Sequence, residues 1–261
     1  MTDRLTDATI AVAHDLADAA RAVTLRHFRT ALPVESKGTD FDPVTVADRE
    51  AEAAMRAILA RRRPDDGILG EESAAKPGTS GLTWVLDPID GTRGFISGTP
   101  IWGVLIGLSD GDGPVYGLID QPYIGERFEG WAGAARLTHG GATRALSVRR
   151  GRGLAEATVL TTFPEVGTPA EGEAFRRVAA RCRLTRYGMD CYAYALLAAG
   201  QVDLVIEAGL QPYDIAAPIA VVRGAGGIVT DWQGGAAHGG GTCLAAATPE
   251  LHRAALELLN A

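Results

Sequence analysis

The sequence lacks several features that mark common classes of protein. Its 261 residues contain no run approaching the ~18 apolar residues that a membrane-spanning helix needs. Charged residues interrupt the first 20 positions, so they do not resemble the apolar core of a secretory signal. The net charge is −7, which argues against a broad surface for nucleic acid or anionic lipid. We therefore expect a cytoplasmic protein that binds neither membranes nor nucleic acids.

Cysteine and histidine are also scarce. The three cysteines, Cys182, Cys191 and Cys243, are odd in number and show no C-x-x-C spacing. We expect them to be buried thiols in a reducing compartment and not a disulfide framework or a zinc site. None of the five histidines neighbours a motif discussed below, so we expect no histidine base.

What is present is an ordinary globular composition, with 46% hydrophobic and 22% charged residues. Apolar positions recur at helical spacing over residues 3–29 and in a segment that Thr45 and Asp48 would cap and Pro64 would end. Hairpin-linked strands then give way, after about residue 155, to alternating strands and helices. This pattern predicts an α/β protein with an N-terminal lobe (1–150) and a C-terminal lobe (151–261), packed as one unit.

The stretch WVLDPIDGTRGF, residues 84–95, carries the first chemical signal. A short apolar strand, Trp84 to Leu86, leads to Asp87 and Asp90. Two ionised carboxylates this close repel unless they share a proton or a cation lies between them. Proline fixes the backbone between them, so the carbonyl of Ile89 can converge with both side chains. Ligands that are all oxygen favour Mg²⁺ or Mn²⁺ over zinc.

Gly91 and Thr92 follow at once and are expected to open a helix. The free N–H groups of a helix N-terminus attract anions such as phosphate. Carboxylates, a divalent metal and a helix N-terminus together indicate a phosphate ester held by metal. From this stretch alone, a turn with two solvated aspartates stays open.

Three other stretches place acidic residues at element ends. Glu71 and Glu72 follow the strand GILG, and Asp42 and Asp48 surround a helix start. Tyr213-Asp214 begins a further helix, which we expect to end at Gly226-Gly227. Each stretch alone is weak evidence, because glutamate pairs are usually solvated and an aspartate near a helix start is usually a cap.

Taken together, these motifs resemble a known family. GEES (70–73), DPIDGT (87–92), YDIAAP with a later GAGG (213–218, 224–227) and DPVTVAD (42–48) resemble the inositol monophosphatase-like family of Mg²⁺-dependent, lithium-sensitive phosphatases. The motifs occur in the family's order. The resemblance implies a layered α/β/α/β/α sandwich, with an antiparallel sheet in the first lobe and a smaller mixed sheet in the second. It also implies a homodimer.

The resemblance further implies a set of metal ligands. Glu71, Asp87 and the Ile89 carbonyl would hold one Mg²⁺, and Asp87, Asp90 and Asp214 a second. Glu71 with water would support a weaker third. Mn²⁺ could substitute for Mg²⁺.

It also implies how the phosphate is attacked. Thr92, polarised by Asp48, would with Glu71 activate the attacking water, while the backbone of Gly91 and Thr92 grips the phosphate. Lys37 matches a family lysine near the phosphate entrance. The reaction would be one-step, in-line hydrolysis with the metals neutralising the oxygens.

Further residues bear on the substrate. At the spacing of Glu207, inositol phosphatases carry a glutamate that meets a hydroxyl, and Asp190 would add a second carboxylate. An alkylammonium gains a charge-assisted bond there, typically ~1.5–3 kcal/mol. Residues 87–108 and 190–218 resemble the histidinol-phosphatase branch of the family, which implies L-histidinol phosphate as the substrate. Gly188 and Arg186 are further candidates for substrate binding.

Alternatives remain open at this point. Asp190 could be the N-cap of the helix that follows it, and Arg186 a surface arginine or a contact with a partner subunit. Arg93 stands where many inositol phosphatases have asparagine. The chain could instead hydrolyse inositol phosphate or other polyol phosphates. It could also serve protein contacts, as a transcription cofactor would, with incidental catalysis.

Overall fold

The computed structural model describes residues 5–31, 35–36 and 43–261. Two long helices form the outermost layer, α1 (Asp7–His27) and α2 (Val46–Arg62). Thr6 caps α1, and Thr45 with Asp48 forms the capping box that was predicted for α2. The first helix is shorter than the predicted 3–29, because Thr6 and Phe28 have extended backbones at its two ends.

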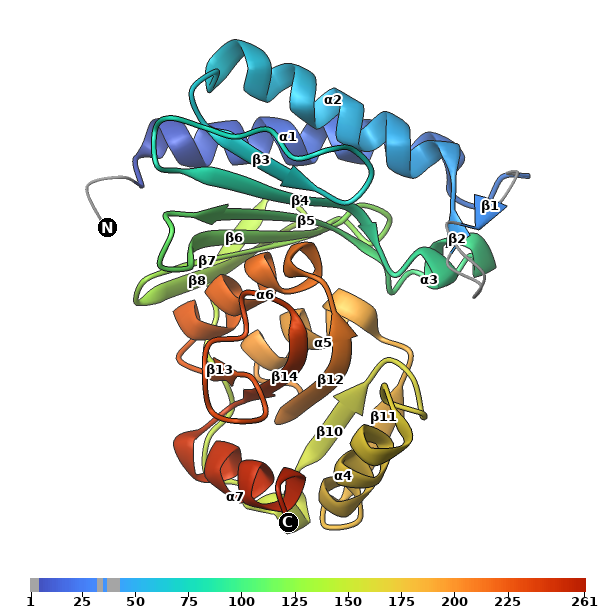
Figure 1. Cartoon of the computed structure of the whole chain (residues 1–261), viewed down its shortest axis with the longest axis vertical. Helices are drawn as coiled ribbons and strands as arrows, with labels where there is room; N and C mark the ends of the chain where they lie inside the picture. The colour runs from blue at the N-terminus through green and yellow to red at the C-terminus, as the bar shows by residue number, and fades with distance from the viewer. Residues whose placement is uncertain (1–4, 32–34, 37–42) are drawn as a thin grey trace.

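A seven-stranded sheet forms the second layer (Figure 1). Within the described residues, its first two strands run parallel and every other neighbouring pair is antiparallel, so the sheet is not wholly antiparallel as predicted. A short helix, α3 (Thr92–Ser97), follows β4, and β1 (Glu35–Ser36) pairs with β2 (Pro43–Val44) outside the sheet. In order across the sheet, the strands are β3 (Gly67–Gly70), β4 (Thr83–Asp90), β5 (Gly103–Ser109), β6 (Pro114–Gln121), β7 (Glu126–Trp131), β8 (Ala134–His139) and β9 (Ala142–Ala145).

The remaining three layers come from the second half of the chain (Figure 1). Helices α5 (Asp190–Ala198) and α6 (Pro212–Gly224) lie between the two sheets, and α4 (Pro169–Ala179) and α7 (Pro249–Leu259) cover the far side. The five-stranded sheet is mixed, as predicted. Its order is β11 (Leu184–Tyr187), β10 (Thr158–Thr161), β12 (Leu204–Leu210), β14 (Gly241–Ala246) and β13 (Ile228–Thr230). A 3₁₀ turn, Leu154–Glu156, precedes β10.

These layers confirm the predicted α/β/α/β/α sandwich. The division into lobes 1–150 and 151–261 stays a prediction, and its boundary falls between β9 and β10. Among the described residues, no helix combines the length and apolar character that crossing a bilayer demands. Cys191 and Cys243 are buried thiols as expected, whereas Cys182 is only half-buried.

A row of glycines brings α6 close to the first sheet. Gly107, Gly117 and Gly130 are register partners on β5, β6 and β7. A Cβ on Gly117 would lie 2.2 Å from the carbonyl oxygen of Ala217, and one on Gly130 would lie 2.4 Å from the Cα of Val221. The missing side chains therefore allow the helix backbone to pack directly on the strands.

Candidate metal centre and substrate pocket

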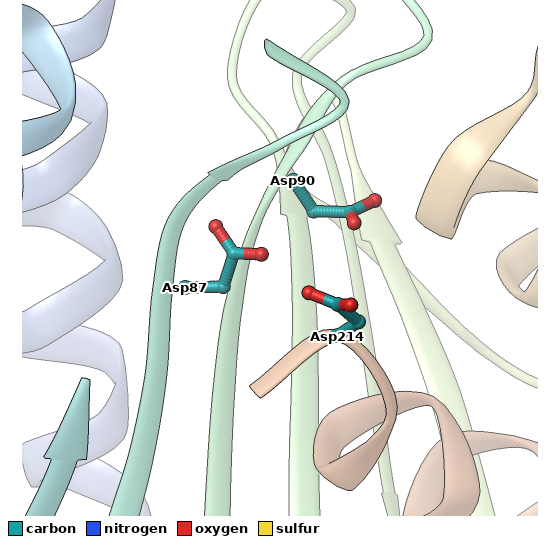
Figure 2. Close-up of side chains that lie close together, drawn as sticks. All are labelled: Asp87, Asp90 and Asp214. Atoms are coloured by element: carbon teal, nitrogen blue, oxygen red, sulfur yellow. The ribbon is translucent and has the colours of Figure 1, made fainter. Parts of the chain in front are cut away.

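Three carboxylates meet at the junction of the first sheet and α6. Asp87 and Asp90 come from β4, and Asp214 comes from the first turn of α6 (Figure 2). Each offers an oxygen, and these oxygens all lie within 4.8 Å of one another. Asp90 and Asp214, which are 124 positions apart in sequence, thus belong to one cluster of carboxylates.

The backbone of β4 and the neighbouring helices orient these carboxylates. The strand runs through to Asp90 and does not end at Leu86 as predicted, and its register with β5 shifts between Asp87 and Asp90. Asp87 accepts a hydrogen bond from the N–H of Ile89 at 3.0 Å. Asp90 accepts one from the N–H of Cys191 in α5 at 2.6 Å. The irregular strand therefore turns both side chains toward α6.

Asp214 is fixed by the helix that carries it. Its carboxylate accepts a hydrogen bond from the N–H of Gln211 at 2.7 Å, which closes a capping box at the start of α6. The helix begins at Pro212, one residue before the predicted start, and ends at Gly224, ahead of the predicted Gly226-Gly227. Asp214 thus caps its helix and also faces Asp87 and Asp90.

The charges around Asp87 and Asp90 are unfavourable without a cation. Burial raises the pKa of Asp87 well above its usual value, and the charges of Glu71, Asp90 and Asp214 raise it further. Burial, followed by the charges of Asp190 and Asp214, does the same to the pKa of Asp90. A buried set of carboxylate oxygens with mutual repulsion fits a hard divalent cation such as Mg²⁺ or Mn²⁺.

Glu71 reaches this cluster through strand pairing. It follows β3, which runs parallel to β4 with Gly70 opposite Leu86. The next residues along the two chains, Glu71 just after β3 and Asp87 still within β4, therefore lie at the same edge of the sheet. Glu71 and Ile89 both line the pocket at this edge, so the residues predicted to hold metal are together.

The pocket has a volume of about 380 Å³. It is lined by most of the residues that were predicted for the site, whereas Asp48, Arg186 and Gly188 are not part of its lining. Lys37 and Asp42 lie outside the described residues. The predicted residues that line it are Glu71, Asp87, Ile89, Asp90, Gly91, Thr92, Asp190, Glu207 and Asp214.

Gly91 and Thr92, which were predicted to bind phosphate, lie at the start of α3 and line the pocket. Gly91 has a left-handed backbone (φ +83°), and a Cβ there would lie 3.0 Å from Cγ of Asp190. The hydroxyl of Thr92 donates to the Ile89 carbonyl at 3.1 Å. Asp48 is buried and accepts hydrogen bonds from the N–H and the hydroxyl of Thr45. Its predicted action on Thr92 stays a prediction.

Glu207 is more tightly held than the sequence suggested. It is buried and accepts hydrogen bonds from the hydroxyl of Thr161 (3.1 Å) and from the N–H and hydroxyl of Thr162 (2.7 and 2.9 Å). Burial raises the pKa of Glu207 to about 8 despite these donors. The donors could have been anticipated only from strand pairing, because β10 and β12 are parallel with Leu160 opposite Val205.

Asp190 also lines the pocket. Burial raises its pKa to about 6, which the charge of Arg93 partly opposes. The alternative that Asp190 caps α5 is wrong, since Met189 occupies the N-cap position and Asp190 is the first helical residue, with a left-handed φ of +42°. The side chain of Asp190 lines the pocket.

Arg93 and Phe163 are pocket residues whose contact was not predicted. The Arg93 guanidinium lies over the Phe163 ring at 4.7 Å from its centroid. Arg93 belongs to α3, which follows β4 of the first sheet, and Phe163 follows β10 of the second sheet. The contact therefore links a segment of the first half of the chain to one of the second half. Phe163 directly follows the Thr161–Thr162 pair that holds Glu207.

Comparison with known proteins agrees with this geometry. The model of the inositol monophosphatase family matches residues 6–261, so the chain belongs to that family of phosphatases.

Three similar proteins carry related names. A chloroplastic bifunctional phosphatase of Arabidopsis thaliana is 40% identical, with 100% of this chain and 77% of the relative covered. A histidinol-phosphatase of Mycobacterium tuberculosis is 36% identical over 94% of this chain and 95% of the relative. An inositol-1-monophosphatase of Caulobacter vibrioides is 33% identical over 77% and 80%. The chain is thus similar to phosphatases named for two different substrates.

A solved structure has the same fold. An inositol monophosphatase from Zymomonas mobilis superposes with a TM-score of 0.86 at 40% identity, covering 97% of each chain. The predicted fold and family are therefore confirmed.

Proposed function

We propose that this phosphatase is a Mg²⁺-dependent phosphomonoesterase that hydrolyses L-histidinol phosphate to L-histidinol and phosphate. One observation supports the proposal: a single pocket is lined both by an all-oxygen carboxylate cluster and by two further carboxylates, Asp190 and Glu207. The cluster would serve the phosphate, and the second pair would serve a cationic alcohol.

The divalent ions would be held by Glu71, Asp87, the Ile89 carbonyl, Asp90 and Asp214. When bound, such ions stabilise charge on phosphoryl oxygens and on the leaving oxygen. The side chains and backbone of the protein would position the reacting groups. Thr92 would orient the attacking water, and the N–H groups at the start of α3 would receive phosphate oxygens.

Asp190 is the stronger candidate for the substrate's ammonium group. Burial raises the pKa of Glu207 to about 8, so much of it is protonated at pH 7. Even an ionised carboxylate offers only about four lone-pair sites, and Glu207 already accepts three hydrogen bonds from Thr161 and Thr162. Glu207 can therefore accept few further hydrogen bonds, and a single hydrogen bond from the substrate would occupy its last acceptor site. Asp190 lies beside Gly91, which is proposed to bind phosphate, and would therefore be nearer to the reacting group.

Hydrolysis of inositol phosphate or another polyol phosphate is the second candidate. It is favoured by the Caulobacter and Zymomonas relatives, which are named as inositol phosphatases. A protein-contact role is a weaker candidate, because the carboxylates expected to hold metal are all present in the pocket. The homodimer, lithium sensitivity, cytoplasmic location and the roles of Arg186 and Gly188 stay predictions.

The test is phosphate release at pH 7 with Mg²⁺ from histidinol phosphate and from inositol 1-phosphate. The wild-type enzyme is expected to prefer the amine, and Asp190→Ala to lower kcat/KM for the amine by about 10- to 100-fold, as loss of a charge-assisted bond predicts. The polyol rate should change much less. Glu207→Ala should also lower kcat/KM for the amine, but by a smaller factor than Asp190→Ala.

Glu165→Ala is the matched control, because Glu165 is an exposed carboxylate in the second half of the chain that does not line the pocket. It should leave both rates unchanged. A wild-type preference for inositol 1-phosphate would refute the substrate assignment. Failure to hydrolyse any phosphomonoester with Mg²⁺ would refute the enzyme itself.

A further inference from the structure

The turn that carries Glu71 is held by two side chains of α2. Glu52 is fully buried and accepts a hydrogen bond from the N–H of Glu72 at 2.7 Å. Its other carboxylate oxygen accepts from Nε of Arg56 at 2.7 Å. A terminal nitrogen of Arg56, Nη2, donates to the carbonyl of Ser73 at 3.0 Å. One acid and one base thus hold an N–H and a carbonyl of the same turn.

Burying a carboxylate is costly unless it is paired and its oxygens are hydrogen-bonded. Glu52 meets both conditions, through Arg56 one helical turn later and through the turn's backbone. Gly70 provides the necessary space, because a Cβ on Gly70 would lie 2.5–2.6 Å from the Glu52 carboxylate atoms. The sequence therefore places a glycine, a buried acid and an arginine at one point.

We propose that Glu52 and Arg56 are positioning residues that preorganise Glu71 for metal binding. On its N-terminal side, Glu71 is anchored by the pairing of Gly70 with Leu86 in β4. On its C-terminal side, it is anchored by the bonds from Glu52 and Arg56 to Glu72 and Ser73. Both flanks are fixed, so the Glu71 side chain is held beside Asp87. This inference rests on the proposed metal site.

The expected effect is on ion affinity. Groups that orient a metal ligand typically account for 10- to 100-fold in affinity when they are removed. Glu52→Gln keeps the shape of the side chain but removes the charge that pairs with Arg56. We expect this variant to bind Mn²⁺ about 10-fold more weakly than the wild-type enzyme. Once Mg²⁺ is saturating, KM for the phosphate ester should be nearly unchanged.

The measurement is calorimetric titration of the full-length, chelator-treated enzyme with Mn²⁺, without substrate. Glu50→Gln is the matched control. Glu50 lies on the same helix, its side chain is 45% exposed, and it pairs with His27 at the surface. Both variants change the net charge equally, so only a local effect separates them. Glu50→Gln should bind Mn²⁺ like the wild-type enzyme.

A second variant covers the case in which Glu52→Gln fails to fold. Arg56→Lys keeps the positive charge but lacks the fork that reaches both Glu52 and Ser73, and should weaken Mn²⁺ binding about threefold. Unchanged Mn²⁺ affinity in folded Glu52→Gln, with or without a lower melting temperature, would overturn the proposal. If Glu52→Gln is unfolded, an unchanged Mn²⁺ affinity of Arg56→Lys would overturn the proposal instead. A wild-type enzyme that binds no Mn²⁺ would refute the metal site itself.

Discussion

Two groups of buried acids in the seven-stranded sheet have opposite electrostatics. Asp87 and Asp90 on β4, with Asp214, form the metal cluster described above. Asp120 on β6 and Glu129 on β7 form what we call the paired cluster. Asp87, Asp120 and Glu129 are each at most 2% exposed, so burial does not distinguish Asp87 from the paired cluster, although Asp90 and Asp214 are only half-buried.

The paired cluster is neutralised by side chains of the protein. Asp120 accepts hydrogen bonds from Arg21 at 2.6 and 3.0 Å and from Arg127 at 2.8 Å. Glu129 accepts hydrogen bonds from the Tyr116 hydroxyl at 2.7 Å and from Arg136 at 2.9 Å, and Nε2 of His14 lies 2.7 Å from it. Its acids are thereby already satisfied.

The pKa values follow this difference. Burial opposes ionisation of Glu129, but the hydrogen bonds from His14, Arg136 and Tyr116 outweigh it and lower its pKa to about 2. Around Asp87, burial and the neighbouring carboxylates act in the same direction and raise the pKa. A buried acid in this fold is therefore structural when cations of the chain face it. It is a candidate for metal binding when other acids face it.

The largest expected effect comes from Asp90→Asn. Metal catalysis contributes several kcal/mol, so phosphate release with Mg²⁺ should fall by roughly 10³-fold or more. Without divalent ions, the variant should unfold at the same or a higher denaturant concentration, because one of several repelling charges is gone. Addition of Mg²⁺ should raise the melting temperature of the wild-type enzyme more than that of the variant. Two results would contradict the assignment of Asp90 to a metal cluster of mutually repelling acids. One is retained turnover, and the other is a variant that is less stable than the wild type in chelator.

The second effect comes from Glu129→Gln. Holding the pKa of a carboxyl at about 2 instead of 4.5 stabilises the folded state by about 3 kcal/mol at neutral pH. Replacing Glu129 should therefore lower the free energy of unfolding by roughly that amount, as measured with urea. Folded enzyme should retain its kcat. Asp90→Asn is thus expected to lose activity and keep its stability, whereas Glu129→Gln is expected to lose stability and keep its activity.

The same substitution predicts a change in acid sensitivity. Because the folded-state pKa of Glu129 is depressed, its contribution is fully present above about pH 4.5 and is lost as the pH falls toward about 2. Glu129→Gln should flatten the wild-type loss of stability in that window. An unaltered slope between these pH values would show that other carboxylates dominate it.

The metal cluster could be anticipated from sequence, and the paired cluster could not. Asp87 and Asp90 are three residues apart in one motif, so their proximity follows from local sequence, and the family resemblance added the distant Asp214. Arg21 and Asp120 are 99 residues apart, and His14 and Glu129 are 115 apart, in segments with no motif. Nothing local indicates which face of α1 covers which strand.

The candidate substrate carboxylates were only partly predictable for the same reason. The position of Glu207 at the end of a strand was visible in the sequence. Its bonds to Thr161 and Thr162 depend on the parallel pairing of β10 with β12, across 45 or 46 residues. The α/β class followed from the order of helical and strand patterns, and the layers followed from the family resemblance. The boundaries shifted because caps such as Thr6 decide where helices begin.

The smallest expected effect tests how much the Tyr116 hydroxyl contributes to the stabilisation of ionised Glu129 in the paired cluster. Tyr116→Phe removes one buried donor to Glu129 and leaves Arg136 and His14 in place. A hydrogen bond to a charged group contributes roughly 1.5–3 kcal/mol, so the loss in unfolding free energy should be about 1.5 kcal/mol, below that of Glu129→Gln. The acid-induced loss of stability should also begin at a higher pH, because the pKa of Glu129 rises when a donor is removed.

A double-mutant cycle makes this quantitative. In the Glu129→Gln background, Tyr116→Phe should cost less than half as much, since the charged acceptor is already gone. Tyr192→Phe is the matched control, because its hydroxyl donates to Glu126 and not to Glu129, and its cost should add to that of Glu129→Gln. Additivity for Tyr116→Phe would mean that Glu129 is stabilised by its cations alone, in which case the hydroxyl is a passive neighbour of the cluster.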